Sequence, residues 1–466
     1  MIDRKALLAD LQRFLTNIEA DLLERSDSAE VPEIGARLRD DYQAARQAGR
    51  TAQNFEDWRA DAITQAAVAW VLSAVFVRFL EDNDLIEPPR IAGPGDRLKR
   101  ARDEHELYFR ANPRQTDREY LLSIFDSLKK DVATRELFGE HNPLRTHPNW
   151  LSGDAARDLI AFFQRVEPST GGLIHDFTDP AWDTRFLGDL YQDLSEATRK
   201  KYALLQTPIF VEEFILDRTL DPALDEFGLA PLGYDARLDA RGRLAPADRF
   251  RMIDPACGSG HFLLGAFARL LDRWRKTEPG LNESILAQRA LDSVHGVDLN
   301  PYAIAIARFR LLLVALRESG ITRLKDAPGF EIHLACGDSL LHGGITGDQR
   351  TLGWTGIDHV YQPEDRDLLE RFLRPGSYHA VVANPPYITP KDRALNQAYR
   401  ERFSTCHRQY SLAVQFLERI VSLAVDGGYT GQITANSFMK REFGKKLIEE
   451  YFPKVDLTHV IDTSGA

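Results

Sequence analysis

Apolar residues recur every three or four positions through most of the first 180 residues. The pattern is clearest in LLADLQRFLTNIEADLL near the start and in AITQAAVAWVLSAVFVRFLEDNDLI from Ala62. This spacing places apolar side chains on one face of an α-helix, and alternation typical of strands is scarce here. GPGDRL (93–98) and NPLRTHPNW (142–150) contain Pro and Gly and separate the helical blocks. We therefore expect an all-α N-terminal domain over residues 1–180.

From residue 181 onward, short apolar runs alternate with helical segments. Strand, turn and helix follow one another in RFRMIDPACGSGHFLLGAFARLLDRW and again in SVHGVDLNPYAIAIARFRLLLVAL. Further apolar runs ending in polar or Gly-rich residues are FEIHLACGDSLL, YHAVVANPPY, GGYTGQITANSFM and VDLTHVIDTSGA. This alternation predicts an α/β fold with a doubly wound, mostly parallel sheet, whose ligands bind beyond the carboxyl ends of the strands. We assign it to residues 181–466, with polar insertions near 228–249 and 342–377.

Composition limits the classes of protein. With 466 residues, 43% hydrophobic and 28% charged, the chain has room for two or three globular domains. Its three cysteines lack metal-ligand spacing and the pairing usual in secreted proteins, so we expect no metal and a cytoplasmic location. The N-terminus lacks the apolar core of a signal peptide, and the apolar run 66–77 is too short to span a bilayer. A net charge of -11 argues against a general nucleic-acid coat, but it allows a local basic strip.

Three acidic residues follow successive predicted strands. Asp254 opens DPACGSG, Asp298 lies in GVDLNP, and Asp338 lies in CGDSLL. Gly258 and Gly260 allow a tight turn and close backbone approach at a helix N-terminus, although their spacing fits neither the dinucleotide fingerprint nor the P-loop. An acid after the second strand can accept both hydroxyls of a ribose, and Asp338 could accept an exocyclic amine. The three acids together predict an adenosine-like ligand.

The ordered motifs DPACGSG, GVDLNP, GDSLL and NPPY resemble those of gamma-class N6-adenine DNA methyltransferases. The upstream segment QTPIFVEEFILDRTL is similar to the one that precedes the Gly-rich motif in that class. The resemblance covers roughly residues 186–466 and implies a class I S-adenosylmethionine-dependent methyltransferase fold with a Rossmann-like sheet. It also implies that S-adenosyl-L-methionine is held by Thr207, Pro208, Asp254, Pro255, Ala256, Cys257, Gly258, Gly260, Asp298, Leu299, Asp338, Ser339 and Asn384.

The NPPY motif, residues 384–387, suits methylation of a planar amine. The lone pair of an adenine amine is delocalised into the ring, and accepting both of its N–H groups frees that lone pair. The side chain of Asn384 can accept one, and the resemblance assigns the other to the carbonyl of Pro385. Pro385 and Pro386 fix the backbone, while Tyr387 offers a face for stacking the base. We expect direct in-line displacement on the methyl group, without a general base, on a base flipped out of the duplex.

The segment after NPPY, ITPKDRALNQAYRERFSTCHRQYS, is rich in basic and aromatic residues. We expect double-stranded DNA as the partner, with the aromatic residues Tyr399, Phe403 and Tyr410 interleaved among the basic ones. The predicted phosphate contacts are Lys391, Arg393, Arg400, Arg402 and Arg408.

Three other segments resemble the large adenine methyltransferases of bacterial phage-defence systems, of the BREX or phage-growth-limitation type. They are FEDWRADAITQAAVAWVLSAVFVRFLEDNDLI, YSLAVQFLERIVSLA and HVIDTSGA. In the gamma class a target-recognition domain follows the catalytic core, and we expect that domain to be absent from this chain. Further expected partners are therefore other phage-defence proteins or a separate target-recognition segment. We expect the 466-residue chain to bind S-adenosylmethionine, but to methylate DNA weakly or not at all unless the rest is supplied.

Two alternatives remain open from the sequence. N-methyltransferases of protein glutamine or ribosomal RNA resemble this core and also use NPPY, but the long helical N-terminus and the basic segment favour DNA. A non-catalytic DNA-binding subunit of a defence complex would not need an intact Asn384, Pro385 and Tyr387. A combined restriction enzyme is disfavoured because residues 1–180 contain no convincing Asp…Glu-x-Lys nuclease constellation.

Overall fold

The computed structural model describes residues 3–47, 51–146, 149–194, 207–229, 249–344, 366–390 and 392–462. The chain divides into two compact units, which are described separately. The first comprises Met1–Ala44, Gln53–Arg199 and Arg308–Phe330, and the second comprises Ala45–Ala52, Lys200–Ala307 and Glu331–Ala466. The hydrophobic pattern gave no sign that residues 308–330 group with the N-terminal part, and the boundary near residue 180 stays a prediction.

The N-terminal region is helical, as predicted. Among its described residues the only β pairing is an isolated bridge between Val166 and Leu173. Local capping explains several helix starts, because Asp3 accepts the N–H of Ala6 at 3.0 Å and Ser152 accepts that of Ala155 at 3.0 Å. The helices are α1 (Arg4–Asp27), α2 (Pro32–Gln47), α3 (Phe55–Asp82), α4 (Asp96–Ala111), α5 (Asp117–Lys130), α6 (Arg135–Phe138), the 3-10 turn η1 (Pro143–Thr146), α7 (Gly153–Phe163) and α8 (Arg185–Leu194).

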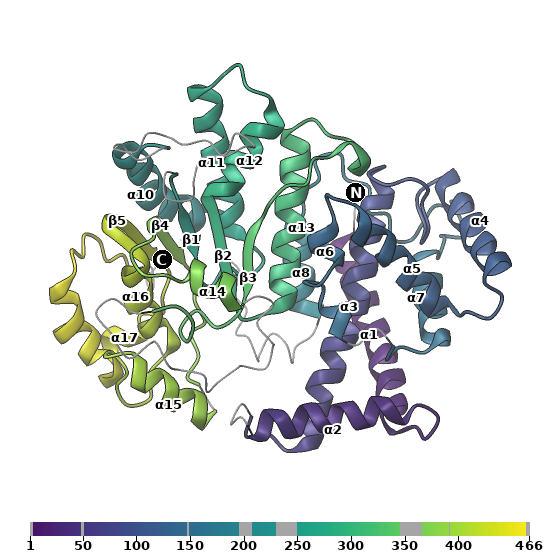
Figure 1. Cartoon of the computed structure of the whole chain (residues 1–466), viewed down its shortest axis with the longest axis horizontal. Coiled ribbons are helices and arrows are strands. Elements are labelled where there is room, and N and C mark those ends of the chain that lie inside the picture. The colour runs from purple at the N-terminus through teal and green to yellow at the C-terminus, as the bar shows by residue number, and fades with distance from the viewer. Residues whose placement is uncertain are drawn as a thin grey trace. The chain divides into compact units, whose positions relative to one another are not determined.

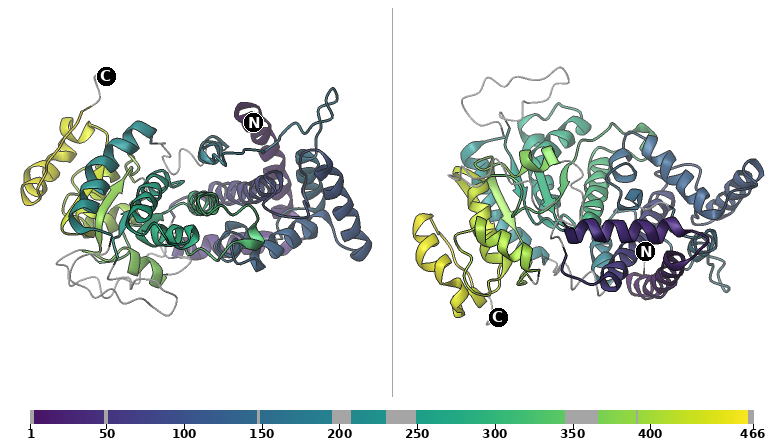
Figure 2. Two further views of the ribbon diagram at one scale, coloured as in Figure 1. Left: turned by 90° about the horizontal axis from the view of Figure 1, so that it is seen from above. Right: turned by 60° about the horizontal axis from the view of Figure 1, so that its bottom comes forward.

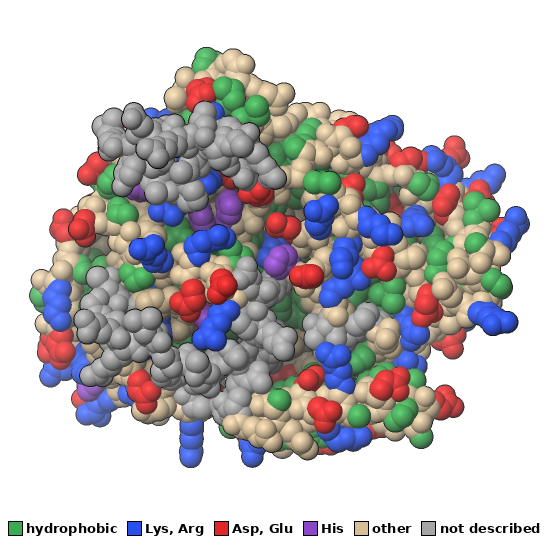
Figure 3. Space-filling view, viewed as in Figure 1, with side chains coloured by type: hydrophobic (Ala, Val, Ile, Leu, Met, Phe, Trp, Pro, Cys, Tyr) green, Lys and Arg blue, Asp and Glu red, His purple; other side chains and the backbone are tan. Residues whose placement is uncertain are grey.

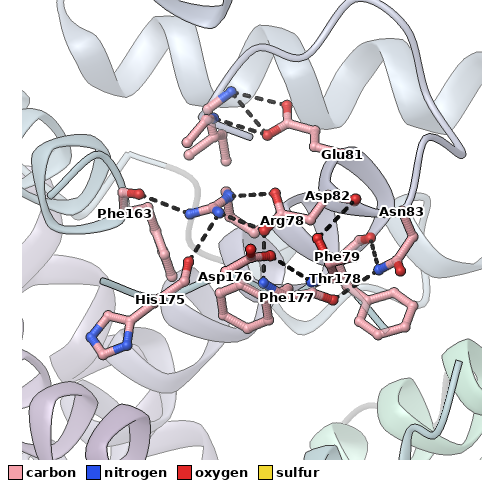
Figure 4. Close-up of polar contacts among 12 residues, drawn as sticks. Arg78, Phe79, Glu81, Asp82, Asn83, Phe163, His175, Asp176, Phe177 and Thr178 are labelled. Carbon is pink, nitrogen blue, oxygen red and sulfur yellow. Dashed lines mark hydrogen bonds and ion pairs between the residues drawn. The ribbon is translucent and has the colours of Figure 1, made fainter. Parts of the chain in front are cut away.

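Helix α3 is the apolar centre of the first unit. By length and composition it would also suit a membrane span, but 89% of its most apolar stretch is buried inside the structure. Near its end Arg78 and Asp82 are fully buried and form an ion pair of 2.7 Å (Figure 4). Arg78 also donates to the carbonyls of Phe163 at 2.9 Å and His175 at 3.2 Å. Because a buried charge needs partners, these contacts tie α7 and the segment around His175 to α3.

Glu81, three residues after Arg78 in α3, binds a second segment, residues 90–92. Its carboxylate accepts the backbone N–H groups of Arg90, Ile91 and Ala92, at 2.5, 2.9 and 3.0 Å (Figure 4). Burial raises the pKa of Glu81 to about 7. The polar residues at the end of α3 thus have a structural role, because they bind neighbouring segments of the first unit.

The second unit contains a five-stranded sheet in which all pairings are parallel (Figure 1). The strand order is β3-β2-β1-β4-β5. This arrangement confirms the predicted doubly wound α/β fold. It brings the carboxyl ends of β1, β2, β3 and β4 to the same side of the sheet. The strands are β1 (Met252–Asp254), β2 (Val294–Asp298), β3 (His333–Cys336), β4 (Tyr378–Ala383) and β5 (Ala424–Gln432).

Helices cover both faces of the sheet. Since alternate strand residues face opposite sides, Ile253, Val381 and Ala383 pack on one face with Leu369 of α14 and Ile420 of α16. On the other face α10 lies so close to β5 that a Cβ at position 431 would stand 2.8 Å from Thr219. The helices of this unit are α10 (Ile209–Phe227), α11 (His261–Thr277), α12 (Glu283–Ser293), α14 (Arg366–Phe372), α15 (Arg393–Arg402) and α16 (Leu412–Leu423). Helix α13 (Pro301–Glu318) is divided between the two units at residue 308.

The last part of the described chain forms short helical turns at the outer margin of the second unit in every view (Figures 1 and 2). They are α17 (Ser437–Lys440), η5 (Glu442–Gly444), η6 (Leu447–Tyr451) and η7 (Phe452–Lys454). The sequence predicts a strand in VDLTHVID, but residues 455–462 form neither helix nor strand, and residues 456–462 are exposed. That prediction is wrong here because the apolar side chains of Leu457, Val460 and Ile461 find no sheet neighbour in the described chain. Of the insertions predicted near 228–249 and 342–377, residues 230–248 and 345–365 lie outside the described residues.

Candidate active site

The Gly-rich turn joins β1 to α11 and is anchored to the neighbouring strand. Gly258 and Gly260 have φ angles of 52° and 85°, a left-handed conformation that favours glycine. The N–H of Cys257 donates to the carbonyl of Val297 at 3.1 Å, and that of Gly258 donates to Asp298 at 2.9 Å. A Cβ at position 258 would meet no atom within 4 Å. The turn is therefore held by hydrogen bonds to β2, and there is open space beside Gly258.

Asp254 and Asp298 are the acids at the ends of β1 and β2. Asp298 accepts two N–H groups, from Gly258 at 2.9 Å and from Asn300 at 2.8 Å. Burial raises the pKa of Asp298 to about 6. Asp254 accepts the N–H of Ala256 at 2.9 Å, and burial, with a smaller effect of nearby Asp298, raises its pKa well above the usual value. Both carboxylates keep further lone pairs, so additional donors such as hydroxyls would stabilise them.

Asp338 lies in the segment after β3 and is only 5% exposed. One carboxylate oxygen accepts the N–H of Leu340 at 2.8 Å, and the other accepts the hydroxyl of Tyr399 at 2.6 Å. Burial raises the pKa of Tyr399 well above that of a free phenol, so this hydroxyl remains a donor. Ser339 donates to the carbonyl of Pro255 at 2.6 Å and so joins this segment to the Gly-rich turn.

Arg419 of α16 holds the same segment from beneath. Its fully buried guanidinium donates to the carbonyls of Ser339, His342, Gly344 and Leu373, at 2.8, 2.8, 2.7 and 2.8 Å. Burial lowers the pKa of Arg419 to about 9. Arg419 thereby holds together two described segments, one that ends at residue 344 and one that begins at residue 366.

Asn384 ends β4, and its amide is held from both sides. The amide nitrogen donates to the hydroxyl oxygen of Thr207 at 3.1 Å, and the amide oxygen accepts the hydroxyl of Tyr387 at 2.5 Å. Thr207 is 7% exposed and precedes Pro208, the N-cap of α10. Burial raises the pKa of Tyr387, which keeps its hydroxyl protonated. Asn384 and Tyr387 remain partly exposed and so are open to a ligand.

The predicted phosphate contacts do not form one group. Arg393 is exposed at the start of α15, whereas Arg402 donates to the carbonyls of Leu341 at 2.6 Å and His342 at 3.2 Å. The guanidinium of Arg402 is thus already used within the fold. Lys391 lies outside the described residues.

Two more of the predicted basic residues take part in local contacts. Arg400 donates to Asn396 at 2.8 Å and lies over the ring of Tyr410, 4.9 Å from its centroid. Arg408 pairs with Glu442 at 2.9 Å, and both side chains are more than half exposed. On the face shown in Figure 3, basic and acidic side chains are interspersed, without a single basic field. Exposed Arg393, Arg400 and Arg408 stay predicted DNA contacts.

The aromatic residues of this segment have a different role from the one expected. Tyr399, Phe403 and Tyr410 are buried in a core with Leu340 and Phe438. They cannot present a face to DNA without unfolding that core, so the expected mixture of basic and aromatic contacts is wrong. The burial follows from their positions, because apolar and aromatic side chains at this spacing line the inner face of α15 and of the loop after it.

The second unit therefore brings together the predicted residues at the ends of β1, β2, β3 and β4, with Thr207 beside Asn384. Sequence reasoning missed the roles of Tyr399 and Arg419. The sequence contains an indication that Arg419 is buried. It lies seven residues after Leu412 and four before Leu423, on the otherwise apolar face of this helix. In the parts of the chain that the structure describes, no three His, Cys, Asp or Glu side chains gather as a metal site.

Strand order, the Gly-rich turn and the strand-end acids define a class I S-adenosylmethionine-dependent methyltransferase fold, as the sequence predicted. Residues 292–466 match the family described as Eco57I restriction-modification methylase. The chain is 49% identical over its whole length to the adenine-specific methyltransferase PglX of Streptomyces coelicolor and covers 39% of that protein. These matches confirm the resemblance on which the predicted residues rest.

More distant relatives match less than half of the chain. The chain is 27% identical to the type II methyltransferase M.PaeR7I of Pseudomonas aeruginosa, over 47% of this chain and 33% of that protein. It is 25% identical to the type II restriction enzyme and methyltransferase RM.Eco57I of Escherichia coli, over 42% of this chain and 21% of that protein. The chain spans less than half the length of each of these three relatives.

Proposed function

We propose that this chain carries the catalytic part of a DNA methyltransferase that modifies the N6 amine of a flipped-out adenine. The observation that carries the proposal is the amide of Asn384, held at the end of β4 in the same unit as Asp254, Asp298 and Asp338. The 49% identity over the whole of this chain to part of an adenine-specific methyltransferase supports adenine as the base.

The residues around the Gly-rich turn fit S-adenosyl-L-methionine. Open space beside Gly258 suits close approach of a ligand, and partly buried Asp298, with its raised pKa, would gain from hydroxyl donors such as those of a ribose. Asp338 would accept the amine of the cofactor's adenine, and Thr207 would lie beside its methionine part. When bound, S-adenosylmethionine supplies a methyl group on a positively charged sulfur, which makes that group open to attack by a nitrogen lone pair.

Asn384 would accept one N–H of the amine to be methylated, and the carbonyl of Pro385 would accept the other. Both bonds favour a tetrahedral nitrogen, whose lone pair is localised and nucleophilic. A neutral amide does this without the desolvation cost of a buried carboxylate. The methylated amine is strongly acidic until it loses its extra proton, so the chain needs no general base at this position.

Tyr387 would stack on the extruded base. Flipping costs about a few kcal/mol, and stacking on an aromatic ring recovers about 1–3 kcal/mol per base. Exposed Arg393, Arg400 and Arg408 would contact phosphates beside the pocket.

We further propose a cytoplasmic bacterial phage-defence or restriction-modification setting, in which double-stranded DNA is the substrate. Other defence proteins or a separate target-recognition segment would complete the activity. The high identity to PglX supports this setting over a role on protein glutamine or ribosomal RNA.

Single-molecule sequencing of DNA from cells with and without the intact gene tests the substrate. We expect N6-methyladenine at one sequence motif only when the gene is present. Identical adenine modification in both strains, together with loss of methylation on a protein or RNA in the deleted strain, would refute DNA as the substrate.

A further inference from the structure

The side chain of Asn384 can present either its oxygen or its nitrogen to a neighbouring group, because a half-turn of the amide exchanges them. Only the oxygen can accept an N–H from the amine to be methylated. In the structure the nitrogen donates to Thr207 at 3.1 Å, which turns the oxygen to the opposite side, where Tyr387 donates to it at 2.5 Å. The catalytic amide is therefore oriented by two hydroxyl groups.

We propose that Thr207 is a positioning residue, which fixes the Asn384 amide with its oxygen toward the amine, and that the Tyr387 hydroxyl caps this oxygen until the amine arrives. The proposal rests on the proposed methyltransferase function. It assigns to Thr207 a role toward the substrate in addition to its expected contact with the cofactor.

The position of Thr207 makes it a rigid partner. It is 7% exposed and stands just before α10, whose buried residues Leu216, Thr219 and Leu220 pack the helix in the second unit. Pro208 follows directly and limits the backbone further. The packing of α10 thus fixes the position of the Thr207 hydroxyl. This hydroxyl is therefore preorganised and does not have to move when the substrate reacts.

The chemistry of the hydroxyl fits this role. Thr207 accepts from Asn384 through an oxygen lone pair, and its own O–H proton can still be donated elsewhere. Donation by an amide N–H polarises the amide and strengthens its carbonyl oxygen as an acceptor. Losing the Thr207 oxygen removes both effects, so the amide can reverse and point an N–H at an amine N–H.

Tyr387 differs from Thr207 because its bond uses the oxygen that the substrate needs. A carbonyl oxygen has two lone pairs, but the amine must share this oxygen with the phenol or displace it. Removing only the phenol oxygen leaves the ring for stacking. The Tyr387 hydroxyl should therefore affect DNA binding more than the rate of the bound complex.

The test compares Thr207→Val, which keeps the shape but not the oxygen, with Thr207→Ser, which keeps the oxygen. The matched control is Thr219→Val, because Thr219 is also buried in the α10 segment and its hydroxyl donates to the carbonyl of Ile215, at 2.7 Å, away from Asn384 in sequence. Each variant is made in the complete protein. Methyl transfer from labelled S-adenosylmethionine to unmethylated genomic DNA is measured at saturating cofactor, and cofactor affinity is measured separately by calorimetry.

For Thr207→Val we expect kcat to fall roughly 10- to 100-fold, which corresponds to about 1.4 to 2.7 kcal/mol of lost transition-state stabilisation. Cofactor affinity should fall as well, because Thr207 is also a predicted cofactor contact, and saturating cofactor keeps that loss out of kcat. Thr207→Ser should restore kcat to within about threefold, and Thr219→Val should match the wild type. Tyr387→Phe should lower KM for DNA, because the amine no longer competes with the phenol for the oxygen of Asn384.

A Thr207→Val enzyme with wild-type kcat would overturn the proposal. So would equal losses in Thr207→Val and Thr207→Ser, which would indicate packing, or a loss confined to cofactor affinity, which would indicate a cofactor contact alone. If the wild-type protein transfers no methyl group to any DNA, the proposed function itself fails.

Discussion

At the scale of single residues, the site depends on side chains that orient other side chains. Tyr399 is the clearest case, because its hydroxyl donates to Asp338 at 2.6 Å while Leu340 holds the other oxygen of that carboxylate. Asp338 is the residue predicted to accept the amine of the cofactor's adenine. Tyr399 belongs to α15, the helix after NPPY, and so links that segment to the predicted cofactor site.

Tyr399→Phe should weaken binding of S-adenosylhomocysteine by about 3- to 10-fold, because one hydrogen bond that orients Asp338 is lost. The same variant should discriminate less between S-adenosylhomocysteine and S-inosylhomocysteine, which carries an oxygen in place of the amine. Calorimetry on the purified chain measures both affinities. Tyr410→Phe is the control, since Tyr410 is equally buried but donates to the carbonyl of Asn396, at 3.1 Å. Unchanged discrimination in Tyr399→Phe would remove Tyr399 from the cofactor site.

Much of the candidate site could be predicted from the sequence because its residues stand at fixed positions after strands. Asp254, Asp298, Asp338 and Asn384 were found in this way, and the structure places each at or just after a strand end. The bond between Asn384 and Thr207 could not be predicted, since 177 positions separate the two residues. Hydrogen bonds of this kind depend on how helices pack, which motifs do not encode.

At the scale of elements, the hydrophobic pattern predicted the N-terminal helices and the five strands, while packing decided the exceptions, among them α14 within the segment predicted to be a polar insertion. The basic and aromatic segment after NPPY was expected to face DNA, but its aromatic side chains form a small core with residues of α16 and α17. Residues 455–462 have the apolar spacing of a strand and form none. A strand needs a neighbour to pair with, and local sequence does not show whether one is present.

Strand β4 begins with a buried histidine that should make stability depend on pH. His379 packs against the rings of Phe250 and Phe227, and its ring nitrogen accepts the N–H of Arg251 at 3.1 Å. Burial, with a smaller effect of the nearby Arg251 charge, lowers the pKa of His379 to about 4. The folded protein therefore holds this ring neutral, whereas the unfolded chain protonates it near pH 6.5.

Since the folded pKa lies below the unfolded one, the contribution of His379 is fully present above about pH 6.5 and is lost as the pH falls toward 4. Over this window it amounts to roughly 3 kcal/mol. Urea unfolding at pH 7 and pH 5 should show a smaller loss of stability for His379→Asn than for the wild type. Parallel losses in the two proteins would show that other groups set the acid limit.

At the scale of the whole molecule, charge and length restrict what this chain does by itself. A net charge of -11 leaves DNA contact to local basic residues, and the face in Figure 3 mixes both signs of charge. The chain covers 39% of PglX, so sequence-specific methylation is proposed for the complete protein. The class of fold could be predicted from motif order, whereas the grouping of residues 308–330 with the first unit depends on contacts that only the structure shows.

The most direct test of the central claim is Asn384→Ala in the complete protein, with N6-methyladenine counted by single-molecule sequencing of cellular DNA. Asn282→Ala is the matched control, because Asn282 only caps the exposed start of α12, where it accepts the N–H of Ser284 at 2.8 Å. We predict that Asn384→Ala abolishes the modification while S-adenosylmethionine affinity changes less than about threefold, and that Asn282→Ala keeps full modification. Adenine methylation at wild-type levels in Asn384→Ala cells would contradict the assignment of this amide as the acceptor for the amine.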